Sequence, residues 1–239
     1  MNLIIDIGNT FIKLAVFDGE EIVFLKRYKK VLVKDVKALY KRFAFENSIV
    51  SSVRKTSPYF LSYLTKHHNL MTLSHKTKVP ITNLYGTPKT LGLDRLAAVI
   101  GAASEYPKKK CLVVDIGTCM TYDYIDHKGN YYGGNIAPGA ELRLMSMHHF
   151  TSALPLVKRK WNEEMLGKST KTAIQNGAIW GMKLEIEGFI KTLTSKKGKI
   201  TVLLTGGDAS YFGEILDSEI FVASNLLLKG LHEILKFNV

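Results

Sequence analysis

Two short segments of the chain combine a carboxylate, a glycine and a hydroxyl within a few residues. The first reads DIGNT over residues 6–10, and the second reads DIGT over residues 115–118. Glycine lets a backbone approach a phosphate closely, and the neighbouring N–H groups form a concavity that binds anions. The carboxylate suits Mg²⁺, which commonly takes one or two carboxylates together with substrate phosphates. Two such segments facing each other predict a site that grips a polyphosphate from both sides.

A structural explanation competes with this one. Asp and Gly also serve turn geometry, so either segment alone is better explained as an ordinary β-hairpin. The second segment, at Asp115, repeats the order of the first, at Asp6, after 109 positions. This repetition favours phosphate binding over a plain turn. Lys13, on the strand expected after the first segment, can then reach a phosphate as a point charge.

The repeat also predicts the architecture. Each copy is expected to form a buried strand, a tight turn and a returning strand, over residues 3–17 and 112–125. Because a duplicated unit implies a duplicated fold, we expect two similar α/β lobes. They are predicted at residues 1–106 and 107–239, divided near Pro107, where a helical pattern stops and a basic linker begins.

Apolar spacing predicts the other elements. In the first half it indicates helices over residues 33–45, 58–68 and 91–104 and a strand over residues 48–52. In the second half it indicates helices over residues 140–149, 172–194 and 223–236 and a strand over residues 200–204. The fold class is therefore expected to be mixed α/β.

Residues 167–170 read GKST, like the end of a Walker A phosphate loop. That motif needs another glycine five positions before Gly167, where this chain has Asn162, and it should follow a buried strand. The match therefore fails. Ser169 or Thr170 is instead expected to cap the helix that follows, and a capping residue can still present its side chain to an anion there.

The composition favours a folded cytoplasmic protein. The 239 residues are 46% hydrophobic and 23% charged, which is enough to bury a core. No apolar run approaches the roughly 18 residues that cross a bilayer, and the apolar residues 3–5 end at Asp6 without a basic lead-in or a cleavage site. Two cysteines, Cys111 and Cys119, are too few for a disulfide framework. We therefore expect a cytoplasmic location and no membrane partner.

The net charge of +12 raises the question of nucleic acid. The lysines fall in separate short runs, and no zinc finger, RNA-binding sheet signature or aromatic-interleaved stripe organises them. A generally basic surface also attracts anionic substrates, so nucleic-acid binding is not favoured. Zinc is not favoured either, because the rings of neighbouring histidines, at residues 67–68 and 148–149, point to different sides of a helix or strand.

Five segments follow one another in an informative order. Two phosphate-type motifs lie at residues 6–13 (DIGNTFIK) and 115–121 (DIGTCMT). The other three lie at residues 85–95 (YGTPKTLGLDR), 133–139 (GGNIAPG) and 205–209 (TGGDA). Together they resemble the type III pantothenate kinases of the actin-like ATPase superfamily. In that comparison the YGTPKTLGLDR segment is similar to the pantothenate-binding segment, and TGGDA is similar to the adenosine-side turn of the superfamily.

The resemblance implies two actin-like, ribonuclease H-like lobes with the active site in the cleft between them. It implies ATP-dependent phosphorylation of pantothenate to 4'-phosphopantothenate, the first step of coenzyme A biosynthesis. Mg²⁺ and a monovalent cation, K⁺ or NH₄⁺, would be the cofactors beside ATP. The resemblance also implies a homodimer in which the partner subunit helps to close the pantothenate pocket.

The resemblance further implies roles for individual residues. Pantothenate would be contacted by Tyr85, Gly92, Leu93, Asp94, Arg95 and Thr170. ATP would be contacted by Asp6, Ile7, Gly8, Asn9, Thr10, Phe11, Ile12, Lys13 and Thr118. Asp6 would organise Mg²⁺, Asp115 would lie beside the monovalent cation, and Thr170 is a candidate to act across the dimer.

Asp94 is the expected catalytic residue. It would accept the proton of pantothenate's primary hydroxyl as that oxygen attacks the γ-phosphate of MgATP in line. Arg95 would hold pantothenate's carboxylate, because its planar fork suits bidentate contacts. The structural alternative is that Asp94 caps the helix that follows it, and both roles can coexist.

Two positions depart from the family pattern. Thr87 stands where the family usually has Asn, and Cys119 stands where a small residue such as Ala is usual. Thr87 can change the hydrogen bonding of the pantothenate segment, and Cys119 can make nucleotide binding sensitive to oxidation.

Rival functions remain open at this point. Kinase-like lobes can belong to a non-catalytic nucleotide-binding relative that acts as a regulator or transcription accessory. Another small-molecule kinase or a polyphosphate-cleaving enzyme can use the same fold, because fold does not determine substrate. Retention of the acidic residues and of Arg95 argues against lost chemistry.

Overall fold

The computed structural model describes residues 1–54 and 57–239. Two compact units form within this part of the chain. The first unit comprises Met1–Pro107, Gly129–Tyr131 and Asn225–Val239, and the second comprises Lys108–Lys128 and Tyr132–Ser224. The break after Pro107 lies beside the predicted lobe boundary. The C-terminal segment, expected in the second lobe, lies in the first unit instead.

The first unit contains a five-stranded sheet in the order β3-β2-β1-β4-β5. Its strands are β1 (Asn2–Ile7), β2 (Ile12–Asp18), β3 (Glu21–Tyr28), β4 (Asn47–Ser52) and β5 (Asn69–Thr72). The chain runs antiparallel from β1 through β2 to β3, and β4 and β5 lie parallel to β1 and to each other. The predicted first hairpin is therefore confirmed, with β3 as an additional strand.

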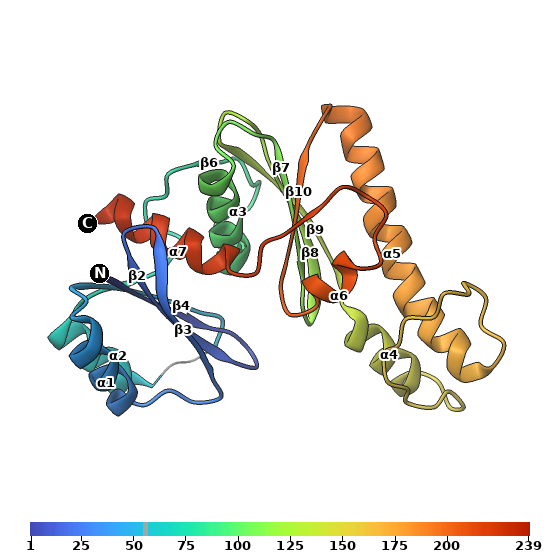
Figure 1. Ribbon diagram of the computed structural model, residues 1–239, viewed down its shortest axis with the longest axis horizontal. Helices are drawn as coiled ribbons and strands as arrows, with labels where there is room; N and C mark the ends of the chain where they lie inside the picture. Colours follow the sequence, from blue (N-terminus) through green and yellow to red (C-terminus); the bar gives the residue numbers. More distant parts are fainter. Residues whose placement is uncertain (55–56) are drawn as a thin grey trace. The chain divides into compact units, whose positions relative to one another are not determined.

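One face of this sheet is covered by α1 (Val33–Phe43) and α2 (Pro58–His67). Figure 1 shows the two helices side by side next to the strands. Successive strand residues point to opposite faces, and the odd-numbered residues of β1 share a buried cluster with residues of these helices. The members of that cluster from β1, α1 and α2 are Leu3, Ile5, Ile7, Val36, Leu39, Phe60 and Leu64. The even-numbered side chains of β1, including Asp6, therefore face the other way.

That other face packs against α7 (Leu226–Asn238), which in turn packs against α3 (Leu93–Glu105), and the two helices cross at two glycines. A Cβ added to Gly230 would lie 1.7 Å from the Ala97 carbonyl oxygen, and one added to Gly101 would lie 2.2 Å from the Leu226 carbonyl oxygen. The two backbones touch at positions where only glycine fits. This close packing explains why the C-terminal helix belongs to the first unit.

The second unit repeats the strand order of the first. Its strands are β7 (Cys111–Ile116), β8 (Cys119–Ile125), β9 (Asn130–Pro138), β10 (Thr201–Thr205) and β11 (Phe221–Val222), in the order β11-β10-β7-β8-β9. β8 is antiparallel to β7, whereas β10 is parallel to β7 and to β11. The first residues of β9 lie in the first unit and pair with β6 (Thr82–Asn83). The internal repeat seen in the sequence is thus a repeat of topology.

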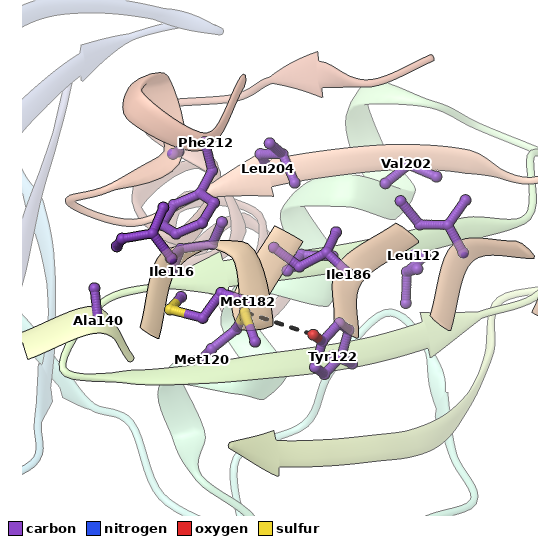
Figure 2. Packing of buried hydrophobic residues seen from close by; sticks show 14 residues of the cluster. Leu112, Ile116, Met120, Tyr122, Ala140, Met182, Ile186, Val202, Leu204 and Phe212 are labelled. Atoms are coloured by element: carbon purple, nitrogen blue, oxygen red, sulfur yellow. Dashed lines mark hydrogen bonds between the residues drawn. The ribbon is translucent and has the colours of Figure 1, made fainter. Parts of the chain in front are cut away.

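The core of the second unit forms between this sheet and α5 (Thr170–Lys197), as Figure 2 shows. Met182 and Ile186 of α5, four residues apart, lie on one face of the helix and pack against Leu112 and other residues of the sheet. The hydroxyl of the buried Tyr122 lies 3.5 Å from the sulfur of Met120. The shorter helices α4 (Ala140–His149) and α6 (Ala209–Gly213) complete the unit. Across residues 1–54 and 57–239, no helix combines the length and apolar character that crossing a bilayer requires.

Candidate active site

The first DIGNT segment forms the turn between β1 and β2. Asp6 pairs with Lys13 across the two strands, and the N–H of Gly8 donates to the Phe11 carbonyl at 3.0 Å. The residues at the tip of this turn, 9–11, are exposed. A Cβ on Gly8 would lie 3.2 Å from the Phe11 carbonyl oxygen, tighter than an ordinary contact. The hairpin therefore exposes backbone and hydroxyl groups at its tip while it buries its carboxylate.

Asp6 is only 8% exposed. Burial raises the pKa of this carboxyl to about 6, the positive charge of Lys13 lowers the pKa, and the negative charge of Asp94 raises it. The structure therefore brings two other predicted site residues, Lys13 and Asp94, within electrostatic range of Asp6. Two carboxylates that repel each other, one of them buried, suit a divalent cation that would relieve their repulsion.

Asp94 lies in the first turn of α3, whose N-cap is Gly92. Its Oδ1 accepts the backbone N–H of Arg95 at 2.8 Å. The carboxylate thus satisfies one of the N–H groups left open at the start of the helix and lies at the positive end of its dipole. The predicted capping position belongs to Gly92, but the stabilising effect expected from Asp94 is present.

Arg95 and Tyr85 meet in the same unit. The Arg95 guanidinium lies 5.7 Å from the centre of the Tyr85 ring, and Arg95 is only 7% exposed. Tyr85 stacks on Tyr131 with ring centres 6.3 Å apart. The backbone N–H of Tyr85 donates to Oδ1 of Asn83 at 3.0 Å. Tyr131 and Asn83 were not predicted, because no local pattern in the sequence links them to the segment at residues 85–95.

Thr87, one of the departures from the family pattern, lies just before a short 3₁₀ turn (Pro88–Thr90). The hydroxyl of Thr90 donates to the carbonyl of Thr87 at 3.0 Å and to its hydroxyl at 2.9 Å. The side chain of Thr87 is therefore used inside its own loop. It shapes the turn that leads into Gly92 and α3.

The second DIGT segment forms the turn between β7 and β8. Asp115 pairs with Thr121, and the N–H of Gly117 donates to the Cys119 carbonyl at 3.0 Å, as Gly8 does in the first hairpin. Thr118 and Cys119 are exposed. The two turns thus share the same closing hydrogen bond, and both present a hydroxyl residue at the tip.

Two glycine segments pack against this second hairpin. The N–H of Gly139 donates to the Thr118 carbonyl at 3.0 Å, and a Cβ on Gly139 would lie 2.1 Å from the Gly117 carbonyl oxygen. Gly206 has a φ of +95°, and its Cβ would lie 2.4 Å from Oδ1 of Asp115. The structure thus brings the GGNIAPG and TGGDA segments to the DIGT hairpin, where side chains have been excluded by close backbone contact.

Two charged pairs near this hairpin were not predicted. Arg159 forms an ion pair with Asp208 and lies 5.2 Å from the centre of the Tyr211 ring. Arg143 of α4 forms an ion pair with Glu185 of α5. Arg159 lies in a basic run that predicts only a charged surface. Arg143 and Glu185 lie too far apart in the sequence for any local pattern to link them.

Thr170 is the first residue of α5, and it is exposed. The hydroxyl of Ser169 accepts the N–H of Thr172 at 3.2 Å, so the predicted capping by Ser169 is confirmed. A Cβ on Gly167 would lie 2.3 Å from the N atom of Ala173, which shows that this glycine packs on the helix. The GKST segment is a capped helix start, not a phosphate loop.

A further group of possible metal ligands lies in the first unit, away from the predicted site residues. Glu20, His232 and Glu233 hold their ligand atoms within 4.8 Å of one another. The ammonium of Lys236 already lies 2.5 Å from Glu20 and 2.7 Å from Glu233. This lysine neutralises the two carboxylates, so the group is explained as an ion-pair network that fastens α7.

Each unit has the same strand order, with an aspartate-glycine hairpin between its first two strands. This is the fold of actin-like ATPases and sugar kinases. A Baf-family protein from Campylobacter jejuni has a similar structure, with a TM-score of 0.62 and 20% identity over 99% of this chain and 98% of its own. A protein from Sinorhizobium meliloti assigned as a 2-dehydro-3-deoxygalactonokinase has a TM-score of 0.60 and 12% identity over 98% of each chain. The predicted fold class is therefore confirmed.

Sequence comparison gives the particular family. The family model for type III pantothenate kinase matches residues 2–192. A type III pantothenate kinase from Phocaeicola vulgatus is 45% identical over 239 residues, which cover 100% of this chain and 99% of the relative. Another from Christiangramia forsetii is 43% identical over 243 residues, with 100% and 99% coverage. The chain belongs to the type III pantothenate kinase family, as its sequence motifs predicted.

Proposed function

We propose that this chain transfers the γ-phosphate of ATP to the primary hydroxyl of pantothenate, forming 4'-phosphopantothenate at the entry to coenzyme A biosynthesis. Family membership over residues 2–192 supports the reaction. The structural observation that carries it is the placement of Asp94 at the start of α3, close enough to the buried Asp6 to raise its pKa. A candidate base and a candidate metal ligand thus lie within electrostatic range of each other.

Asp94 is the general base in this proposal. Its carboxylate accepts the proton of the attacking hydroxyl, a role that typically contributes 10²- to 10⁴-fold to the rate. The hydrogen bond from the N–H of Arg95 at 2.8 Å fixes the rotamer of the carboxylate. Phosphoryl transfer depends mainly on positioning and charge neutralisation, so a base held in one orientation suits this chemistry.

Pantothenate binds beside the base. Arg95 holds the carboxylate of pantothenate, and the contact between its guanidinium and the Tyr85 ring orients that fork. Gly92 and Leu93 bring the backbone to the substrate. Thr170, exposed at the start of the second unit's long helix, is proposed as an additional contact from the partner subunit.

The two hairpins bind the phosphates of ATP. The first contributes residues 6–13 of the first unit, and the second contributes Thr118 of the second unit. Asp6 would hold Mg²⁺, which would neutralise charge on the phosphates. Its buried carboxylate fits such an ion because burial and the negative charge of Asp94 disfavour the unpaired anion, and a bound cation would relieve that cost. Asp115 fits a monovalent cation, K⁺ or NH₄⁺, since its carboxylate lies against the backbone turn at Gly206 and oxygen atoms are the ligands of such ions.

A homodimer is proposed as the active assembly. An apolar groove of about 390 Å³ lies on the outer face of α4 and the segment that follows it. Phe150 is 81% exposed there, Leu156 60% and Met145 56%. A contiguous group of large apolar side chains on a surface is typical of a protein interface. A second copy of the chain is the occupant that the family resemblance implies.

The proposal is tested by ADP release from purified protein with ATP and Mg²⁺, with and without pantothenate, in potassium and then in sodium buffer. Pantothenate-dependent turnover that is faster in potassium supports both the substrate and the cation. ATP binding without turnover would favour the rival function of a regulator or transcription accessory. The cytoplasmic location stays a prediction.

A further inference from the structure

Arg143 of α4 makes two directed contacts within the second unit. Its Nε donates to the carbonyl of Pro138 at 2.8 Å, and its Nη2 forms an ion pair with the carboxylate of Glu185 on α5. The side chain of Arg143 is 20% exposed and that of Glu185 is 35% exposed, so solvent screens the pair only partly. The guanidinium therefore ties α5 to the last residue of β9.

Pro138 is followed directly by the residue that touches the phosphate hairpin. The N–H of Gly139 donates to the Thr118 carbonyl at 3.0 Å, and there is no room for a Cβ on Gly139 beside Gly117. A shift of the Pro138 carbonyl by a fraction of an ångström would move Gly139 and thus disturb this hydrogen bond. Arg143 thus contacts the backbone directly before the residue that hydrogen-bonds the tip of the hairpin.

Glu185 also contacts the strand that returns from this hairpin. The hydroxyl of Tyr122, on the returning strand β8, donates to Glu185 at 3.1 Å. Burial raises the pKa of Tyr122, and the negative charge of Glu185 raises it further, so the hydroxyl stays protonated and remains a donor. The Glu185 carboxylate thus accepts a hydrogen bond from Tyr122 of β8 and forms an ion pair with Arg143 of α4.

We propose that Arg143 and Glu185 are positioning residues for nucleotide binding, which hold the DIGT hairpin and the Pro138-Gly139 backbone in the geometry that receives the phosphates of ATP. Neither residue is assigned contact with the nucleotide. The inference rests on the proposed function for its ligand. The contacts come from two helices and a strand, and side chains locked on such elements fix a site more accurately than loops do.

The planar fork of arginine is essential to this arrangement. Its Nε and Nη2 point to the Pro138 carbonyl and to Glu185 at the same time, whereas a lysine ammonium on a flexible stem lacks this fixed geometry. Arg143→Lys should therefore behave like Arg143→Met in nucleotide binding. Loss of one charge-assisted hydrogen bond corresponds to about a tenfold change in an equilibrium constant.

The test measures the dissociation constant of MgATP by calorimetry and the KM values for ATP and pantothenate. Arg143→Lys and Arg143→Met should each raise the MgATP dissociation constant about tenfold, with the KM for pantothenate unchanged within twofold. Glu185→Gln, which keeps a hydrogen-bond acceptor for Tyr122, should have a smaller effect in the same direction. The double variant Arg143→Met/Glu185→Gln should weaken binding by less than the product of the single effects, because the two residues act as one unit.

Matched controls come from the same helix. Lys183 of α5 pairs with Asp217 at 2.6 Å, and no contact of this pair reaches the DIGT hairpin among the described residues. Lys183→Met, or the milder Asp217→Asn, removes an ion pair from α5 and should leave MgATP affinity unchanged. If the Arg143 variants lower the melting temperature but bind MgATP as tightly as the controls do, the pair is only structural and the proposal is wrong. Because calorimetry detects ATP without catalysis, absent kinase turnover would contradict the proposed function and leave this test valid.

Discussion

A Cβ added to Gly92 would lie 2.6 Å from Oδ1 of Asp94. The φ of Gly92 is −58°, which any residue adopts, so the backbone conformation does not require glycine here. A Cβ at this position would instead push the Asp94 carboxylate out of its observed place. The absence of a side chain at the N-cap of α3 therefore leaves room for the proposed base in its observed position.

Gly92→Ala should consequently impair catalysis by displacing Asp94. We expect kcat/KM for pantothenate to fall about 100-fold, comparable with the smallest losses seen when a general base is removed, while the protein stays folded. Gly188→Ala is the matched control, since a Cβ there meets no atom within 4 Å. Steady-state kinetics and thermal melting of both variants check the prediction, and unchanged kcat/KM in Gly92→Ala would contradict it.

Asp94→Asn tests the base directly. The amide oxygen of Asn can still accept the N–H of Arg95, so α3 should keep its first turn and the melting temperature should change little. The variant cannot take a proton, and kcat should fall by about 10²- to 10⁴-fold. ADP release by the purified variant is the measurement. Turnover close to that of the unaltered chain would exclude Asp94 as an essential base.

Taken by itself, the buried carboxyl group of Asp6 should make the ligand-free protein less stable at neutral pH than at acid pH. Its pKa is 3.8 when unperturbed and about 6 in the folded protein, so the folded state holds the proton more tightly than the unfolded state does. The stability difference is absent below about pH 4, grows as pH rises from about 4 to 6, and reaches roughly 3 kcal/mol above that range.

Asp6→Asn, which resembles the protonated form, should therefore raise the free energy of unfolding in urea at pH 8 and change it little at pH 4. It should also abolish turnover, because the variant lacks the carboxylate proposed for Mg²⁺. Asp18→Asn, at the exposed end of β2, is the control and should leave stability within about 0.5 kcal/mol at both pH values. Equal stability of Asp6→Asn and the unaltered chain at pH 8 would show that burial of this carboxylate carries no such cost.

The hairpins and most helices were predictable because their signals are local. The DIGNT and DIGT segments follow apolar runs of strand length, and the helix at Ala140–His149 ends where its apolar spacing predicts. β3 was missed, since its burial pattern alternates between intermediate and exposed and no residue of it is fully buried. The periodicity of such an edge strand is too weak to distinguish it from a loop.

The membership of the C-terminal helix could not be predicted from the sequence. α7 packs with α3 through Gly101 and Gly230, and a glycine inside a helical pattern gives no indication of which distant backbone will approach it. The same limit applies to the Arg143–Glu185 pair, whose partners lie on different helices. Local patterns indicated the groups that are proposed to meet ligands, but the contacts that support those groups join distant segments and required the fold.

Phe150→Glu should separate the proposed dimer. Phe150 is 81% exposed and belongs to the apolar groove on α4, so a charge at this position would be buried without a partner if a second copy covers the groove. Light scattering after size-exclusion chromatography should show half the mass of the unaltered protein. The KM for pantothenate should rise while the affinity for MgATP stays unchanged, because the partner subunit is proposed to close only the pantothenate pocket.

Tyr59→Glu, at a position in α2 that is 74% exposed, is the control and should leave the mass unchanged. A Phe150→Glu variant that keeps the mass of the unaltered dimer would place the interface on another surface, and a monomeric unaltered chain with full activity would remove the partner subunit from the mechanism.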